Sequence, residues 1–403
     1  MIGDGWDDDA AIRPQAEQDE LNIPPGTRRV AVVTGTRAEF GLLRPVMHAI
    51  AQRRELSLMV IAAGSHLVSP ALTFHDVKRS FAVADIVPMQ IAGRTGRLED
   101  VESLARGIAR CGRIFAKLRP DWVVVLGDRI EAFAAASAAS VGGFALAHIH
   151  GGDRAEGVAD EAMRHAITKL AHLHLPATAQ SRERIVRMGE DQSRVHVVGS
   201  PAMDELAGIT PIDDALYAEL GSPTAIMLLH PVGQPDEVEE ASAAATLDAL
   251  RAMSGERVLV MEPNLDAGRA GIMRAIKSAG VASRANIERT QWIALLKRLA
   301  SLQPMRGVLV GNSSAGLIEA AAIGLPVVDI GPRQRGRERC ANVVHIDHVT
   351  SETIERAMRE ARAVVAGSYQ HPYGDGDTGK RVAQLLVTVN PHDAMMLRKQ
   401  NTY

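Results

Sequence analysis

The residue types most able to do chemistry in this sequence stand at the ends of short apolar runs. Asp128 and Arg129 follow the run WVVVLG, while His148, His150 and Asp153 end or follow the run FALAHI. Solvated surface charge does not account well for a carboxylate at each of two successive run ends. Several carboxylates near one cleft suit acid–base work on a sugar, where positive charge develops at the anomeric carbon. We therefore treat this cluster as a candidate catalytic site.

Further candidates lie in the stretch DEAMRHAITKLAHLH, which we expect to form one helix. Asp160 and Arg164 are one helical turn apart and so share a face. His172 and His174 are expected to pack inside the protein. The HxH spacing followed by an aspartate, seen at 148–153, is only weakly specific for zinc, and we predict no metal site.

Two turns that lead from an apolar run into a helix have the composition of anion sites. TGTRAEFG contains Arg37, and GNSSAG contains Ser313 and Ser314. Free N–H groups at helix starts attract anions, and the arginine adds a fixed charge. Neither turn has a P-loop lysine, so two such turns facing one cleft suit a diphosphate. Glu319 stands one turn further along and could reach ribose hydroxyls. The alternative for each turn is an ordinary helix start with a surface arginine or a serine cap.

The elements that must position these residues alternate regularly from Arg29 onward. The apolar runs RRVAVVTG, LSLMVIAAG, DWVVVLGD and FALAHIHGG are separated by helix-like stretches such as Leu42–Arg54 and Val101–Leu118. A second set, AIMLLHP, RVLVMEP, GVLVGNSS and LPVVDIG, begins near Thr224. Continuous apolar strands between helices indicate parallel sheets buried on both faces. The sequence thus predicts an α/β protein of two Rossmann-like lobes, with the candidate residues at the carboxyl ends of strands, where such sheets bind ligands. No internal repeat is visible.

We expect a disordered, polar extension over residues 1–28, an N-terminal lobe over 29–205 and a C-terminal lobe over 206–375. The first boundary follows the turn residues PPG, and the second lies in GSPAMDELAGITPIDD, which carries Pro, Gly and Asp. The length of 403 residues suits two domains of about 150 to 200 residues each.

Composition excludes several classes of function. A formal net charge of −3 and 3% aromatic residues argue against a nucleic-acid-binding protein. The apolar stretch Ala132–Ile149 contains the pair Gly142-Gly143, so it indicates a buried helix, a turn and a strand rather than a membrane span. The start MIGDGWDDDA is acidic and has no apolar core, so we do not expect it to act as a secretory signal. Two cysteines, Cys111 and Cys340, are expected in the core of a protein from a reducing compartment, the cytoplasm.

The sequence also contains the motifs VVLGDR, HIHGG, LHPV, PNLDAG and HPYGDG. In their types and order, these and the motifs quoted above make the chain resemble the hydrolysing UDP-N-acetylglucosamine 2-epimerases of sialic and legionaminic acid synthesis. The resemblance runs from about Arg29 to Gly376. It implies a GT-B-like fold whose C-terminal segment, 376–403, crosses back to the first lobe. It also implies no cofactor, no metal, a nucleotide-sugar substrate and a homodimer or homotetramer.

The resemblance carries roles onto individual residues. Around the sugar it implies Asp128, His150, Asp153, Asp160 and Arg164. For the nucleotide diphosphate it implies Arg37, His66, His230, Asn264, Ser313, Ser314, Glu319 and Arg333. This chain departs from the family pattern at three places. Asp153 stands where members often have Glu, His150 where some have a catalytic Glu, and Gly233 where Thr is common. The general base is therefore left open among His150, Asp153 and Asp160.

The reaction that the resemblance implies is an elimination followed by addition of water. The diphosphate leaves C1, a base takes the C2 proton, and water then gives the free 2-epimer. Asp128 and Asp160 are the preferred carboxylates, with His150 as the alternative base. Three rival functions stay open: a non-hydrolysing 2-epimerase, a GT-B glycosyltransferase, and a nucleotide-sugar binder in which His150 and Asp153 abolish chemistry. The nucleotide, UDP or GDP, and the sugar substituents at C4 and C6 are open as well.

Overall fold

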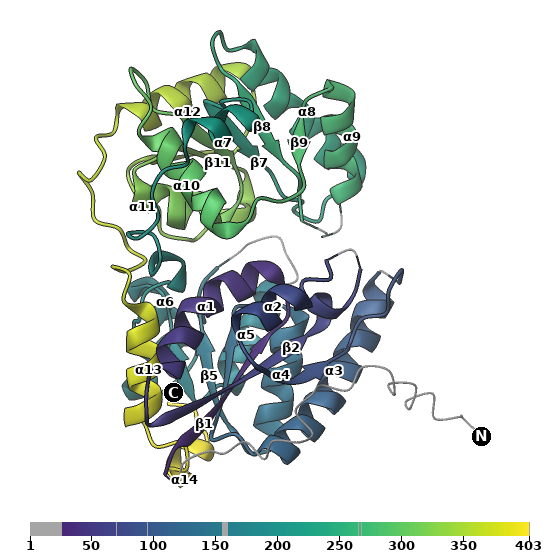
Figure 1. Cartoon of the computed structure of the whole chain (residues 1–403), viewed down its shortest axis with the longest axis vertical. Coiled ribbons are helices and arrows are strands. Elements are labelled where there is room, and N and C mark those ends of the chain that lie inside the picture. The colour runs from purple at the N-terminus through teal and green to yellow at the C-terminus, as the bar shows by residue number, and fades with distance from the viewer. Residues whose placement is uncertain are drawn as a thin grey trace.

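The protein folds into two lobes, each built on a parallel sheet with helices on both faces (Figure 1). This is a computed structural model, and it describes residues 26–69, 71–94, 96–154, 160–264, 266 and 268–402, with Asp160 described in its backbone only. The predicted fold of two Rossmann-like lobes is confirmed. Most of the extension expected over residues 1–28 lies outside the described residues. Arg28, at its end, is the first residue of a strand.

The first sheet has six strands in the order β3-β2-β1-β4-β5-β6. Every pair in it is parallel, and β1 lies between β2 and β4. The chain therefore reverses its direction of travel across the sheet between β1 and β4. The strands are β1 (Arg28–Thr34), β2 (Leu56–Ala63), β3 (Val83–Val87), β4 (Trp122–Leu126), β5 (Ala145–Ile149) and β6 (Leu173–Leu175).

The second sheet repeats this arrangement, in the order β12-β11-β10-β7-β8-β9. Counted from its own first strand, β7, the order is the same as in the first lobe, and the reversal falls between β7 and β10. The two lobes thus share one strand order, although the sequence shows no internal repeat. The strands are β7 (Ala225–Leu228), β8 (Val258–Met261), β9 (Ser283–Arg284), β10 (Val308–Gly311), β11 (Val327–Ile330) and β12 (Val343–Ile346).

Helices cover both faces of each sheet. In the first lobe they are α1 (Arg37–Ala51), α2 (Phe74–Ser80), α3 (Arg97–Leu118), α4 (Ile130–Val141), α5 (Asp160–Leu170) and α6 (Ala179–Arg187). In the second lobe they are α7 (Asp214–Glu219), α8 (Asp236–Ala252), α9 (Arg269–Ala279), α10 (Arg289–Ala300), α11 (Ala321–Ile323) and α12 (Ser351–Ala363).

The C-terminal part of the chain returns to the first lobe, as predicted. After α12 the backbone descends past the second lobe, and α13 (Thr378–Thr388) packs against α1 (Figure 1). The Arg28 guanidinium donates to the carbonyls of Leu386 and Val389, both at 2.7 Å. A last short helix, α14 (Ala394–Leu397), follows. The first strand and the last long helix therefore hold each other in place.

One expected helix ends early. The stretch DEAMRHAITKLAHLH forms α5 only as far as Leu170, and His174 belongs to strand β6. The prediction that His172 and His174 lie on a helix is wrong, although both are buried. The stretch Ala132–Ile149 does form a helix, a glycine turn and a strand. Within the described ranges, no helix is long and apolar enough to cross a membrane. Cys111 and Cys340 are buried free thiols.

Candidate active site

The carboxyl edges of the two sheets face each other at the junction of the lobes, where cross-lobe contacts link the loops. Arg129, after β4, pairs with Asp266 of the second lobe at 3.3 Å. Arg184 on α6 donates to the Gly336 carbonyl of the second lobe at 2.7 Å. In open α/β sheets this edge, next to the point where the strand order reverses, is the usual ligand site. Candidate residues from both lobes lie in these loops.

The turn between β1 and α1 directs Arg37 toward the second lobe. The Thr36 side chain caps α1 by accepting from the Glu39 N–H at 3.3 Å, which starts the helix at Arg37. The Arg37 guanidinium meets the side-chain amide of Asn286 in the second lobe, and the amide orientation that satisfies both groups places its oxygen 3.0 Å from Arg37 Nη2. Arg37 therefore stands at a helix start and at the lobe junction together.

Asp128 and Arg164 form an ion pair at the carboxyl edge of the first sheet. Arg164 Nη2 donates to Asp128 Oδ2, and Arg164 Nη1 donates to the His150 carbonyl at 3.2 Å. The Arg164 side chain is buried, while Asp128 remains partly open. Two residues implied by the resemblance are thus in direct contact. The side chain of Asp160, another implied residue, lies outside the described part of the chain.

His150 is held on both sides of its ring. Its Nδ1 is 2.8 Å from Asp153 Oδ2, and its Nε2 is 2.9 Å from Ser200 Oγ. Its backbone has a φ of 62°, a conformation that costs energy for a residue with a side chain and that recurs at functional sites. Asp153 also accepts from Ser181 Oγ at 2.8 Å. His150 and Asp153 therefore form a fixed, buried unit.

The Asp153 carboxylate is too well stabilised to be a strong base. Burial alone would raise its pKa, but the charge and hydrogen bond of His150, the charge of Arg337 and the Ser181 hydroxyl outweigh burial and hold the pKa at about 2. Arg337 comes from the second lobe. Its Nη2 is 3.9 Å from Asp153 Oδ2, and its Nε donates to the Arg154 carbonyl at 2.6 Å. Sequence reasoning missed Arg337, because only the folded chain brings it to Asp153.

Two candidate histidines are framework residues. His66 is fully buried, with its Nε2 3.1 Å from Thr34 Oγ1 and its Nδ1 2.7 Å from Thr73 Oγ1. Burial lowers the pKa of His66 to about 4, so the ring is neutral at pH 7. His148 is bound in the same way by the Gly127 carbonyl at 2.8 Å and Thr168 Oγ1 at 3.2 Å. Because protein groups occupy both nitrogens of His66, its predicted contact with the nucleotide finds no support in this geometry.

In the second lobe, His230 and Asn264 are joined at the ends of adjacent strands. The Asn264 N–H donates to His230 Nδ1 at 3.2 Å, which leaves Nε2 as the nitrogen that carries the proton. Burial lowers the pKa of His230 to about 3. The backbone of His230 is fixed by Asn312, whose Oδ1 accepts from the His230 N–H at 2.7 Å. Arg333 donates to the Asn312 carbonyl at 3.3 Å.

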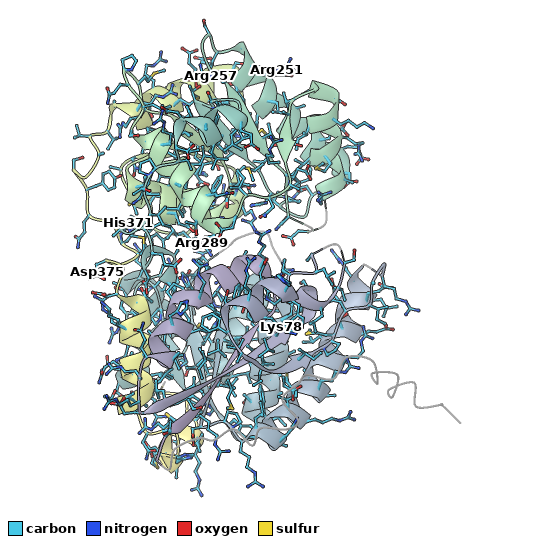
Figure 2. The ribbon with its side chains drawn as sticks, viewed as in Figure 1. Lys78, Arg251, Arg257, Arg289, His371 and Asp375 are labelled. Atoms are coloured by element: carbon cyan, nitrogen blue, oxygen red, sulfur yellow. The ribbon has the colours of Figure 1, made fainter. Side chains whose placement is uncertain are left out.

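The serine turn after β10 starts a helix, as its composition predicts. Ser313 Oγ accepts from the Ala315 N–H at 3.4 Å, and the first turns run through a π-helical segment, Gly316–Ala320. π-Helical turns are rare and frequently mark functional sites. Glu319 lies in this segment and pairs with Arg289 at 3.1 Å. Arg289 also donates to the Ala202 carbonyl at 3.2 Å, and it lies between the two lobes (Figure 2).

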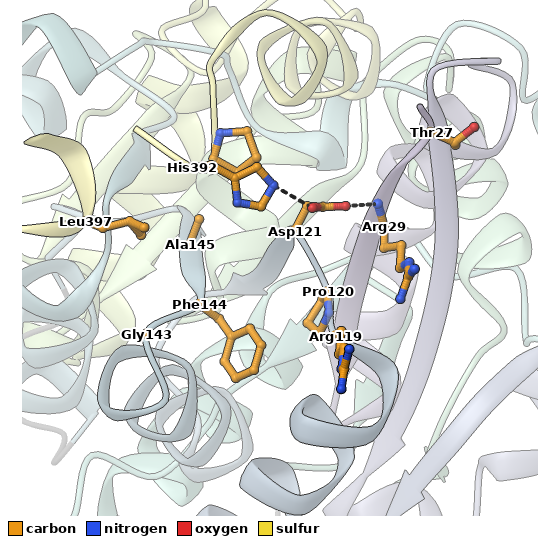
Figure 3. A pocket seen from close by; sticks show the side chains of 11 residues that line it. Thr27, Arg29, Arg119, Pro120, Asp121, Gly143, Phe144, Ala145, His392 and Leu397 are labelled. Carbon is orange, nitrogen blue, oxygen red and sulfur yellow. Dashed lines mark hydrogen bonds and ion pairs between the residues drawn. The ribbon is translucent and has the colours of Figure 1, made fainter. Parts of the chain in front are cut away.

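A cavity of about 510 Å³ lies away from these residues, at the amino ends of β1, β4 and β5. In it the Asp121 side chain accepts from the Arg29 N–H at 2.6 Å and bonds to His392 at 2.8 Å (Figure 3). The chemistry of an α/β sheet is found at the opposite, carboxyl edge, so we do not assign the substrate to this cavity. Within the described residues, no three His, Cys, Asp or Glu side chains converge as a metal site.

Comparison with known proteins gives consistent matches over both lobes. Residues 48–387 match the family described as UDP-N-acetylglucosamine 2-epimerase. A UDP-N,N′-diacetylbacillosamine 2-epimerase (hydrolyzing) of Legionella pneumophila is 34% identical over 93% of this chain and 100% of its own length. A UDP-N-acetylglucosamine 2-epimerase of Neisseria meningitidis is 29% identical over 93% of this chain and 98% of its own. The structure of the Methanocaldococcus jannaschii UDP-GlcNAc 2-epimerase in complex with UDP-GlcNAc and UDP covers 90% of this chain and 100% of its own, with a TM-score of 0.73 and 16% identity.

Proposed function

The chain belongs to the UDP-N-acetylglucosamine 2-epimerase family, and we propose that it is a hydrolysing member, which converts a UDP-linked 2-acetamido sugar to the free 2-epimer and UDP. A GDP-linked sugar is the second nucleotide to test. The observation that carries the proposal is the arrangement of side chains at the lobe junction: Arg37 from the first lobe and the serine turn of the second lie at helix starts, and the Asp128–Arg164 pair lies at the carboxyl edge of the first sheet.

The two helix starts suit the diphosphate. Ser313 and Ser314 offer hydroxyl and N–H donors at the end of β10, and Arg37 offers a guanidinium at the end of β1. Donors placed before the reaction stabilise the charge that develops on the leaving diphosphate as the C1–O bond breaks. Glu319, held by Arg289, is positioned one turn further along for a ribose hydroxyl.

Asp128 is the first choice for the group that faces the sugar. The C2 proton is not adjacent to a carbonyl, so cleavage of the C1–O bond runs ahead of its removal. An ionised carboxylate stabilises the cationic C1 and then accepts the C2 proton, which leaves a glycal-like intermediate. Water adds its oxygen to C1, and a proton returns to C2 from the other face. Asp128 pairs with the Arg164 guanidinium, and Asp160, at the start of the same helix as Arg164, is the second carboxylate.

His150 and Asp153 are assigned to positioning. Asp153 has a pKa of about 2, and both of its carboxylate oxygens bond to protein partners. It therefore accepts a substrate proton poorly. His150 reaches a substrate only by giving up its Nε2 bond to Ser200. Its carbonyl meanwhile holds Arg164, which orients Asp128. The unit formed by His150 and Asp153 thus positions Arg164, and through Arg164 it positions Asp128.

Product analysis tests the proposal. The purified chain is incubated with UDP-N-acetylglucosamine, UDP-N,N′-diacetylbacillosamine and its GDP-linked counterpart, and products are followed by mass spectrometry. We expect free 2-epimer and nucleoside diphosphate from one UDP-linked sugar, with deuterium at C2 when the reaction runs in D₂O. A product that keeps its nucleotide would identify a non-hydrolysing 2-epimerase. Inversion at C2 without deuterium would exclude elimination and hydration.

A further inference from the structure

The motif HPYGDG, residues 371–376, takes no part in the proposed reaction, yet it lies where the two lobes are joined. It belongs to the segment that leaves the second lobe and returns to α13 on the first. Figure 2 shows two of its residues, His371 and Asp375, at the junction of the lobes. The segment after α6, which leads the chain into the second lobe, crosses the motif there, and the Ser200 N–H donates to the Tyr373 carbonyl at 2.7 Å. The two connections between the lobes are therefore bonded to each other.

The crossing is too close for a side chain on either of the two glycines that form it. Gly199 and Gly374 have φ angles of 90° and 102°, which glycine adopts without strain. A Cβ on Gly374 would stand 3.0 Å from Gly199 Cα, and a Cβ on Gly199 would stand 3.1 Å from the Tyr373 carbonyl oxygen. Tyr373 is itself 1% exposed. Because such close packing transmits small displacements, we expect the two segments to move together.

From this crossing, Ser200 reaches the first-lobe part of the site. Its Oγ is 2.9 Å from His150 Nε2 and accepts from the Ala202 N–H at 3.3 Å. Together with the bond from His150 Nδ1 to the Asp153 carboxylate, this is the order of groups in a Ser-His-Asp triad. Ser200 is fully buried, however, so its hydroxyl is not placed to attack a substrate. Ser200 therefore supports the His150 ring, and the His150 carbonyl in turn holds Arg164.

The same motif reaches the second-lobe part of the site through His371. The Tyr373 N–H donates to His371 Nδ1 at 3.3 Å, so the ring proton is on Nε2, which donates to the Ile318 carbonyl at 3.0 Å. Burial lowers the pKa of His371, which favours this neutral ring at pH 7. Ile318 lies in the π-helical turn next to Glu319. His371 thus holds the turn that carries a group proposed for the nucleotide.

The Tyr373 hydroxyl closes a ring of contacts around the lobe junction. It donates to the Glu338 carbonyl at 3.1 Å, and the next residue back along the chain, Arg337, places its Nη2 3.9 Å from Asp153 Oδ2. The ring returns to its start, because Asp153 bonds to His150. Its members are Asp153, His150, Ser200, Tyr373, Glu338 and Arg337. One buried tyrosine therefore connects both lobes to the residues that position Arg164.

We propose that residues 371–376 couple the first-lobe and second-lobe parts of the proposed site, and that His371 and Tyr373 are positioning residues. Tyr373 holds Ser200 and, through it, the His150 ring, while His371 holds the π-helical turn. A displacement of that turn then reaches the first lobe through one short segment of chain, without passing through the substrate. The inference rests on the proposed function only for the substrate that both parts of the site hold.

Steady-state kinetics with a UDP-linked sugar that the chain turns over tests the coupling. His371→Phe keeps an aromatic ring against Tyr373 but removes the bond to Ile318. We expect kcat to fall about threefold to tenfold, the usual worth of one neutral hydrogen bond, because the loss reaches His150. His371→Gln has an amide that can donate to the same carbonyl, and its kcat should return to within about twofold of the natural value. A raised KM with an unchanged kcat in His371→Phe would show a purely local role and overturn the coupling.

Two tyrosines of the returning segment provide a matched pair of variants. Tyr373→Phe removes the bond to Glu338 and should lower kcat about threefold to tenfold. Tyr369→Phe also removes one bond from a hydroxyl to a carbonyl, that of Ala321 at 2.7 Å, but this bond is outside the ring of contacts. Its kcat should stay within about twofold of the natural value. Equal losses of kcat in the two variants would overturn the positioning role of Tyr373.

Histidine NMR without ligand separates this inference from the proposed function. The protein is labelled with ¹⁵N in its histidine rings, and the His150 signals are assigned by their loss in His150→Gln. We expect the His150 Nε2 signal to move in Ser200→Ala and in the distant variant His371→Phe, but not in Tyr369→Phe. Tyr373→Phe gives the same test if His371→Phe does not fold. An unmoved His150 signal in the distant variant would overturn the coupling whatever the substrate is, whereas a moved signal in a chain that turns over no UDP-linked sugar would leave the coupling intact and refute the proposed function.

Discussion

At the scale of single residues, Arg37 offers the most direct test of the diphosphate site. Arg37→Ala removes a charged donor from a helix start at the lobe junction. Hydrogen bonds to charged groups contribute about 1.5 to 3 kcal/mol, so UDP affinity should fall about 10-fold to more than 100-fold. Calorimetric titration with UDP measures the change. Arg44→Ala is the matched control, because Arg44 stands two turns further along α1 and pairs with Glu205 at 2.7 Å. Equal losses in both variants would remove Arg37 from the site.

Asp128 is the residue whose charge the proposed reaction uses most. Asp128→Asn keeps the size of the side chain but removes its charge and basicity, so turnover should fall by about 10² to 10⁴. UDP affinity should change little, because the diphosphate donors lie on other loops. Asp121→Asn is the control at the amino end of the same strand, where Asp121 bonds to Arg29 and His392. Full turnover by Asp128→Asn would exclude Asp128 as stabiliser and base.

The melting temperature tells whether the loss comes from chemistry or from packing. Arg164 is buried beside Asp128, so weakening their ion pair lowers stability as well as activity. Arg164→Lys breaks the bond to the His150 carbonyl while it keeps the charge. If Asp128 only anchors Arg164, both variants should lose stability and turnover in proportion. A catalytic Asp128 should lose far more turnover than its change in melting temperature explains.

At the scale of elements, the strands that sequence predicts are those with continuous apolar runs. β4 and β5 lie in the middle of a sheet and are buried throughout, so their sequences carry a clear pattern. β6 and β9 lie at sheet edges and have three and two residues, too few to show any period. β3 is an edge strand whose burial is partial and whose sequence, VADIV, contains an aspartate. These edge strands escape prediction because they are too short to show a period, as β6 and β9 are, or only partly buried, as β3 is.

Only some residues of the candidate site can likewise be predicted from the sequence. Residues at strand ends, such as Asp128 and His230, could be found from sequence because each follows an apolar run. Arg337 and Ser200 could not, since their partners Asp153 and His150 lie far away along the chain. Glu39 was visible only as part of a turn motif. Nothing in sequence alone indicates that its carboxyl group is buried and accepts from the Gly35 N–H.

The first strand sets where the chain can be shortened. The sequence predicts a disordered extension over residues 1–28, but Arg28 belongs to β1 and donates to two carbonyls at the end of α13. Removal of residues 1–25 should therefore leave the melting temperature unchanged. Removal of 1–28 should lower it by several degrees, since each lost charged hydrogen bond is worth about 1.5 to 3 kcal/mol. Thermal unfolding of the two shortened chains decides between them, and equal melting temperatures would show that Arg28 does not anchor α13.

At the scale of the whole molecule, the two lobes use one topology for two tasks. In each lobe the functional loops leave the pair of strands where the strand order reverses, β1 with β4 and β7 with β10. The first lobe presents acids and Arg164 there, and the second presents serines, His230 and Asn312. Under the proposed function, one fold repeated without a sequence repeat supplies the sugar-facing acids and Arg37 from the first lobe and the remaining nucleotide-binding groups from the second. The contacts between the two lobes then decide whether these groups act together on one substrate.

The loop after β11 is the main candidate for such a contact between the lobes, and Arg337 is the residue of this loop that makes it. The Arg337 side chain is 9% exposed and reaches across to Asp153 and the Arg154 carbonyl in the first lobe. When the lobes separate, Asp153 loses this cation, and the unit that it forms with His150 loses part of its stabilisation. We therefore expect lobe closure to complete the support behind Arg164 and Asp128, as closure does in many enzymes.

Arg337→Ala tests this coupling, with Arg335→Ala as a control on the same loop. Arg335 pairs with Asp347 inside the second lobe at 2.7 Å and is half exposed. Arg337→Ala should reduce turnover about 10-fold to 100-fold through the loss of its cross-lobe hydrogen bond to Arg154 and ion pair with Asp153, while UDP affinity falls less. Small-angle X-ray scattering with UDP should show less compaction for Arg337→Ala than for the natural chain. Arg335→Ala should match the natural chain in both measurements. If Arg337→Ala compacts fully and yet turns over slowly, Arg337 acts on Asp153 locally and does not hold the lobes together.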